Sequence, residues 1–261
     1  MRYPIESSTS LPSGVSLCVD ADRNIILPNE LISLLLAARE GYCWPGGTTR
    51  LESQKVVRDL EAEVQQWMDS SGAEGAWNIV QRVSKWGGNN VNSQSQITRA
   101  DTSTKQAMRE AIQRLNKIET PEKGLRALCD LPGINLVMAS KIYRFCVPDR
   151  GAALDRHSSY FFNSLQRVTE DGTGRGATKF VREWSTAQHK ISRLAIYTQT
   201  GFERVLREYL TVYLPLLRDI ASSLNSSQKL YKSAVHDELT KWRPADVEMA
   251  AYYWWAHHGP R

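Results

Sequence analysis

The chain has 261 residues, of which 41% are hydrophobic and 23% are charged, so it can bury one large core or two smaller ones. Its formal net charge of +5 suits a polyanionic partner but does not identify one. The longest apolar run, residues 31–38, is too short to span a bilayer, and no two of the four cysteines have the spacing of a zinc ribbon or an iron–sulfur cluster. We therefore expect no membrane contact, no metal and no cofactor.

The predicted elements are mainly helical. Residues 15–19 and 25–27 are apolar stretches on either side of a turn, and they predict a small hairpin or an extended arm. The polar stretch 89–95 and the glycine-rich stretch 170–177 predict loops. Apolar periodicity and helix-capping residues predict helices over 29–39, 51–68, 73–86, 102–116, 121–130, 135–146, 157–168, 202–224, 226–241 and 244–256. This pattern predicts the all-α class.

The most informative stretch is a tight turn between two of these helices. Thr120 and Pro121 can start the first helix, and Leu131-Pro132-Gly133-Ile134 forms the turn. The N–H groups at the start of the second helix would point outward, where the helix dipole favours a phosphate. Such a turn binds the DNA backbone without reading sequence, although Pro-Gly turns also occur at ordinary helix corners.

Leu131-Pro132-Gly133-Ile134, followed by Leu154-Asp155-Arg156-His157, resembles the helix-hairpin-helix DNA glycosylase superfamily, which includes endonuclease III. Asp155 lies 22 residues after Gly133, which is the spacing of that family. The resemblance covers residues 120–162, and more weakly 28–40. It implies that Asp155 is the catalytic residue and that His157 approaches a backbone phosphate.

The chain departs from the family at two positions. Asn135 replaces the second glycine of the turn, and we expect it to tolerate the left-handed conformation there. Val137 stands where bifunctional members carry a nucleophilic lysine, 18 residues before Asp155. Valine cannot form a Schiff base, so the resemblance implies a monofunctional enzyme.

An aspartate in this place has a definite chemical task. Breaking the bond between base and sugar develops positive charge on the sugar, and a nearby carboxylate in a dry cleft stabilises that charge and orients water. The alternative for Asp155 is a helix cap, with His157 as a half-exposed residue of the first turn.

Other candidate residues are less specific. Lys141 favours a phosphate contact over a displaced nucleophile, and Gly133, Asn135 and Val137 complete the predicted DNA-binding turn. Trp44, Trp86 and Asn89 lie beside glycines and could line a pocket for an extruded base, although ordinary packing at helix ends is the better explanation for each of them taken singly.

The sequence thus predicts two helical lobes, 29–150 and 1–28 plus 151–261, with a cleft for double-stranded DNA between them. The predicted reaction is hydrolysis of the N-glycosidic bond of a damaged or modified base, without a cofactor, by a monomer. We expect a soluble protein of the cytoplasm, associated with the nucleoid, or of the nucleus. The alternatives are a non-catalytic helix-hairpin-helix DNA-binding protein and a helical protein-interaction domain.

Overall fold

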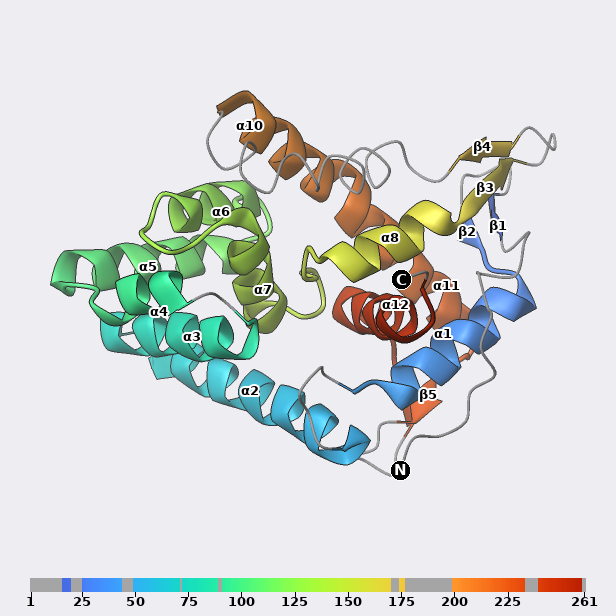
Figure 1. Ribbon diagram of the computed structural model, residues 1–261, viewed down its shortest axis with the longest axis horizontal. Helices are drawn as coiled ribbons and strands as arrows, with labels where there is room; N and C mark the ends of the chain where they lie inside the picture. The colour runs from blue at the N-terminus through green and yellow to red at the C-terminus, as the bar shows by residue number, and fades with distance from the viewer. Residues whose placement is uncertain are drawn as a thin grey trace.

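The computed structural model describes residues 16–19, 25–43, 49–70, 72–88, 91–169, 174–176, 199–232 and 239–259. Over these residues the chain is mostly helical, which confirms the all-α class. In Figure 1 most of the helices fall into two groups. None of the described helices is both long and apolar enough to cross a membrane.

The first group consists of helices that follow one another along the chain. The members are α2 (Arg50–Ser70), α3 (Ala73–Trp86), α4 (Val91–Thr98), α5 (Thr102–Asn116), α6 (Pro121–Cys129) and α7 (Leu136–Cys146). In α3 and α5 apolar residues recur every three or four positions and form one buried side, such as Ile79 and Val83 in α3 and Met108 and Leu115 in α5.

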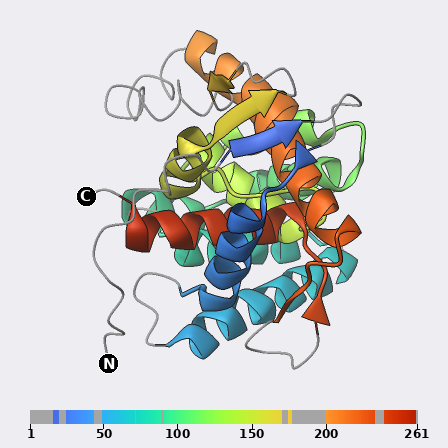
Figure 2. The ribbon, with the colours of Figure 1, turned by 90° about the vertical axis from the view of Figure 1, so that its right-hand side faces the viewer.

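The second group surrounds α12 (Pro244–His258), which packs against α1 (Asn29–Gly41), α8 (Arg156–Ser164) and α11 (Leu214–Ser226). Figure 2 shows α1 lying across α12. Because partners cover α12 on several sides, its apolar residues are buried around the helix rather than along one stripe. α10 (Gln199–Glu208) and the π-helical turn η1 (Tyr209–Tyr213) lead into α11.

The boundary between the groups differs from the predicted lobe boundary at one helix. Residues 29–41 belong to the predicted first lobe. In the structure they form α1, which packs against α12 of the second group. The division into two functional lobes stays a prediction.

A small sheet lies beside the second group. Its order is β2 (Ile25–Ile26), β1 (Ser16–Val19), β3 (Gln166–Thr169) and β4 (Gly174–Gly176). β1 and β2 pair antiparallel, which confirms the predicted hairpin, while β1 and β3 pair parallel. The predicted helix over 157–168 is therefore too long, because α8 ends at Ser164 and the following residues join the sheet.

Two other predicted elements are wrong. The polar stretch predicted as a loop becomes helical from Val91 as α4, anchored by buried Ile97, whose carbonyl accepts a hydrogen bond from Trp77 Nε1 at 2.9 Å. The predicted helix over 226–241 does not form. α11 ends at Ser226, and the short strands β5 (Tyr231–Lys232) and β6 (Leu239–Thr240) follow. Asn225 fixes this return by two hydrogen bonds of 2.9 Å with the backbone of Trp242.

A largely buried ion-pair network joins the two groups. Asp246 Oδ1 and Oδ2 contact Arg39 Nη2 at 2.8 Å and Arg243 Nε at 2.9 Å. Glu61 of α2 contacts Arg144 Nη2 of α7 at 2.9 Å and Arg243 Nη1 at 3.1 Å. Burial raises the pKa of Asp246, but Arg243 and Arg39 outweigh it and hold that pKa below its usual range. The network fixes α7 against the start of α12.

Candidate functional site

The turn between α6 and α7 requires glycine at one position. Gly133 has a φ of +80°, which side chains on an L-residue rarely allow. A Cβ atom there would also lie 2.6 Å from the backbone oxygen of Ser93 in α4. Ile134 is buried below the turn and holds it against the core. The predicted Pro-Gly turn is present, and α4 packs directly on it.

Asn135 does not take the left-handed conformation that we predicted. Its φ of −105° and ψ of 175° are extended, and it is the N-cap of α7, with its side-chain oxygen accepting the Met138 N–H at 2.9 Å. The prediction is wrong because Asn has two local preferences, and here the capping preference is satisfied. No hydrogen bond from the N–H of Leu136 or Val137 is seen among the described residues. These two N–H groups lie at the start of α7, where the helix dipole favours an anion.

Lys141 points toward α3 within the protein. It is buried, and its Nζ donates to the Gly87 carbonyl oxygen at 2.8 Å, at the end of α3 where the helix dipole favours a cation. Trp86 is half-buried beside it, 6.0 Å from Lys141 Nζ to the ring centre, and packs edge-on against Phe145. The structure thus brings two of the predicted site residues together. Trp44 and Asn89, the other predicted pocket residues, lie outside the described residues.

Asp155 is the N-cap of α8 and is half-buried. Its Oδ1 accepts the His157 N–H at 2.8 Å, and its backbone oxygen accepts the hydroxyls of Ser158 and Ser159. No hydrogen bond to Oδ2 is seen in the described part of the chain. The cap therefore occupies one carboxylate oxygen and leaves the other for a ligand or water.

The loop that carries Asp155 is held by three side-chain hydrogen bonds from two elements, α7 and η1. The Leu154 N–H donates to Ser140 Oγ of α7 at 2.8 Å. The hydroxyls of Tyr209 and Tyr213, both presented by the π-helical turn, donate to the carbonyl oxygens of Ala152 at 2.6 Å and Ala153 at 3.1 Å. Since all of these partners are buried, the backbone of the loop is rigid. These positioning residues were not predicted from the sequence.

His157 follows Asp155 and faces α12. Its ring packs edge-on against Tyr252 with ring centres 5.2 Å apart, and its buried Nδ1 has no hydrogen-bond partner among the described residues. Burial lowers the pKa of His157 and outweighs the nearby charge of Asp155, which raises it. These surroundings therefore favour the uncharged imidazole.

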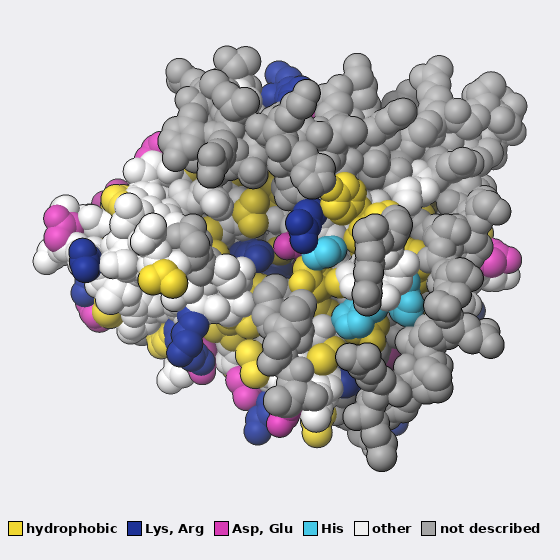
Figure 3. All heavy atoms as spheres, viewed as in Figure 1, with side chains coloured by type: hydrophobic (Ala, Val, Ile, Leu, Met, Phe, Trp, Pro, Cys, Tyr) yellow, Lys and Arg dark blue, Asp and Glu magenta, His cyan; other side chains and the backbone are white. Residues whose placement is uncertain are grey.

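A second carboxyl group near Asp155 was not predicted. Glu248 of α12 is 4% exposed, and no hydrogen bond to its carboxyl group is seen among the described residues. Burial and then the charge of Asp155 raise the pKa of Glu248 to about 8, against the lowering effects of Arg144, Lys141 and Arg39. The only signal in the sequence is an acidic residue within an otherwise apolar helical stretch. Figure 3 shows that basic, acidic and histidine side chains gather where this face of the molecule is hollowed.

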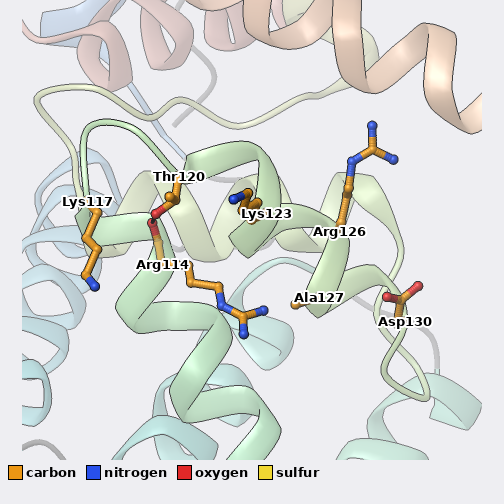
Figure 4. Close-up of a pocket in the computed structure, with 7 residues that line it drawn as sticks. All are labelled: Arg114, Lys117, Thr120, Lys123, Arg126, Ala127 and Asp130. Atoms are coloured by element: carbon orange, nitrogen blue, oxygen red, sulfur yellow. Dashed lines mark hydrogen bonds between the residues drawn. The ribbon is translucent and has the colours of Figure 1, made fainter.

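A basic hollow of about 540 Å³ lies outside this region, between α5 and α6 (Figure 4). We call it the α5–α6 hollow; it is lined by Arg114, Lys117, Thr120, Lys123, Arg126, Ala127 and Asp130.

The cations of the α5–α6 hollow are only partly neutralised. Arg126 pairs with Glu122 and Glu203, whereas no ion pair of Arg114, Lys117 or Lys123 is seen in the described ranges. The residues of α6 that line the hollow are spaced three or four positions apart and therefore lie on one side of the helix. They run from Lys123 to Asp130, toward the α6–α7 turn.

Comparison with protein-family models, with curated proteins and with solved structures finds no match to this chain.

Proposed function

We propose that the protein is a DNA glycosylase of the helix-hairpin-helix type, which hydrolyses the bond between a damaged or modified base and its sugar. The observation that carries the proposal is the Asp155 carboxylate, which is fixed at the start of α8 and keeps one oxygen without a hydrogen-bond partner among the described residues. A rigid, half-buried carboxylate costs little reorganisation when positive charge develops beside it. This matches the task that the sequence predicts for Asp155.

In the proposed reaction the bond from the anomeric carbon to the base nitrogen breaks, and its electron pair leaves with the base. Asp155 stabilises the resulting sugar cation and accepts a proton from the water that attacks it. The products are the free base and an abasic site. Tyr209, Tyr213 and Ser140 hold the loop so that the carboxylate does not have to move during the reaction.

The DNA backbone would be bound at the start of α7. The N–H groups of Leu136 and Val137 and the dipole of α7 favour a phosphate there. The α5–α6 hollow continues this surface along α6 and offers Lys117 and Lys123 to neighbouring phosphates. In this arrangement Lys141 supports the site from within through Gly87, rather than by contacting DNA.

The proposed enzyme leaves the DNA strand intact. A bifunctional glycosylase needs an amine that attacks the sugar, and Val137 has none. Lys141 is held by the Gly87 carbonyl at 2.8 Å. Borohydride treatment during the reaction should therefore trap no covalent enzyme–DNA adduct. An abundant adduct that Lys141→Ala abolishes would contradict this prediction.

The alternative is a DNA-binding protein without catalytic activity, in which Asp155 acts only as a helix cap. The hydrogen bond from the His157 N–H to Asp155 Oδ1 favours this alternative. Duplex binding is common to both proposals, so release of a free base separates them.

Two experiments test the proposed function without assuming a particular base. The first incubates the protein with duplexes that carry single deaminated, oxidised, alkylated or hypermodified bases and detects released base by chromatography. The second compares a duplex that contains a cationic pyrrolidine, which mimics the sugar cation, with one that contains a neutral tetrahydrofuran. We expect binding to the pyrrolidine duplex to be at least about 100-fold tighter, as for a transition-state analogue.

In Asp155→Asn this preference should disappear while binding to the neutral duplex remains. Equal affinity of the unmodified protein for both duplexes, together with no released base, would support the non-catalytic alternative instead.

A further inference from the structure

Glu248 is an unusual residue for its place in the fold. It is the fifth residue of α12, where its neighbours Val247, Met249 and Ala250 are all buried. A buried carboxyl group is normally hydrogen-bonded or paired with a cation, since an unpaired buried charge is costly. No ion pair or hydrogen bond of the Glu248 carboxyl is seen among the described residues. The group is therefore kept in an environment that favours its neutral form.

The side of α12 that carries Glu248 faces the start of α8. Tyr252 lies four residues after Glu248, one turn further along the same side of the helix. The Tyr252 ring contacts the His157 ring, with centres 5.2 Å apart, and the His157 N–H donates to Asp155 at 2.8 Å. Glu248 and Asp155 thus belong to one region between α12 and the start of α8.

The charged and titratable groups near Glu248 come from every element packed against it. They are Asp155 before α8, Arg144 and Lys141 of α7, Arg39 of α1, Tyr42 after α1, Tyr209 and Tyr213 of η1, and Tyr252 of α12 itself.

Two carboxyl groups in one region do not both ionise easily. Asp155 lies at a helix start, where its Oδ1 accepts an N–H, and its side chain is only half-buried. Glu248 has neither advantage. Because the two environments differ, Asp155 is suited to act as the base and Glu248 as the acid, as in other enzymes with two carboxyl groups in unlike surroundings.

We propose that Glu248 is the general acid of the site and gives its proton to the departing base. This inference rests on the proposed glycosylase function. As the bond to the anomeric carbon breaks, the electron pair moves to the base, and the Glu248 carboxyl proton neutralises it. Water adds to the sugar and its proton passes to Asp155; solvent then takes that proton from Asp155 and restores the proton of Glu248.

The proposal implies a class of substrate. A neutral base leaves as an anion unless it is protonated, so its departure requires an acid. A purine alkylated on its imidazole ring already carries positive charge and leaves as a neutral molecule. A general acid at Glu248 is therefore required for the release of neutral modified bases and is dispensable for the release of cationic ones.

The test has one measurement that does not depend on activity. Infrared difference spectra of the protein against Glu248→Gln should show a protonated carboxyl band at neutral pH that is lost near pH 8. In Asp155→Asn the band should be lost at a lower pH, because removing the negative charge of Asp155 favours ionisation of Glu248. Absence of the band at neutral pH would overturn the proposal.

The second measurement is single-turnover base release. Glu248→Gln should release a neutral base about 100-fold more slowly, which is typical of lost general-acid catalysis, and should release a cationic alkylated purine at nearly the unmodified rate. Glu248→Asp should recover part of the loss, while duplex binding stays unchanged in both variants. Glu30→Gln, at an exposed position of α1, is the matched control.

The outcomes separate the two proposals. If the unmodified protein releases no base from any duplex, the glycosylase function fails, and the acid role fails with it. If it releases neutral bases and Glu248→Gln does so equally fast, only the role of Glu248 is wrong. Equal losses on neutral and cationic bases would also overturn the acid role, since they would indicate a structural effect.

Discussion

Replacing Asp155 by Asn and by Ala separates the two roles that its carboxylate combines. Asn caps a helix about as well as Asp, so Asp155→Asn should keep the hydrogen bond from the His157 N–H and the stability of the protein. Ala removes the cap, which costs about 1 kcal/mol and, in a chain of this length, about 2–4 °C in melting temperature. Both variants remove the charge that stabilises the sugar cation.

We expect both variants to lose base excision by a similar factor, about 100- to 1,000-fold, or about 3–4 kcal/mol in the barrier. Single-turnover base release, thermal melting and duplex binding by fluorescence anisotropy measure the three effects separately. Asp101 provides a matched control, because it caps α5 through the Thr104 N–H at 2.8 Å and is exposed. Asp101→Ala should lower the melting temperature without slowing excision. Excision by Asp155→Asn at the unmodified rate would refute the catalytic role and leave the cap as the function of Asp155.

Three further predictions concern the surroundings of the site. Tyr213→Phe removes a hydroxyl that holds the Asp155 loop and should lower the excision rate about tenfold at unchanged duplex affinity; a loss of affinity instead would place Tyr213 in DNA binding. Lys117→Glu combined with Lys123→Glu should weaken duplex binding and reduce the slope of log K against log salt by about two, whereas Lys55→Glu on α2 should not. For Glu248, the pKa in the folded state is about 8 and exceeds that of the unfolded chain, so the folded state binds more protons between about pH 4.5 and 8. Below about pH 4.5 the protonated Glu248 makes its full contribution to the free energy of unfolding. As the pH rises from about 4.5 to 8, the free energy of unfolding should fall by up to about 5 kcal/mol. Urea titrations of Glu248→Gln should not show this pH-dependent fall.

The parts of the site that the sequence predicts are those with local signals. Pro132 and Gly133 determine a turn by their own backbone preferences, and Asp155 marks a helix start because its side chain reaches an N–H two residues later. Asn135 shows the limit of such signals. It can adopt a left-handed conformation or cap a helix, and only the path of the chain into α7 decides for the cap.

The parts that the sequence does not predict depend on contacts between distant segments. β3 forms because β1, about 150 residues earlier, offers a parallel partner, and no feature of residues 166–169 alone distinguishes this from a continued helix. Lys141 was expected on an outward face, but the end of α3 supplies the carbonyl oxygen that holds it inside. Glu248 becomes a candidate site residue only because α12 packs against α8, which brings it near Asp155.

The different environments of Asp155 and Glu248 follow from where helices begin and where they cross. Asp155 stands at a helix start, where free N–H groups and the helix dipole stabilise an anion. Glu248 is the fifth of the fifteen residues of α12, beyond the first four, whose N–H positions have no partner within the helix, and so receives no such help. Two cations of α7 lower the pKa of Glu248 without bonding to it: Lys141 Nζ donates to Gly87, and Arg144 Nη2 contacts Glu61. The fold thus keeps a buried acid unneutralised although paired cations lie nearby, an arrangement that costs stability and that a purely structural role does not require.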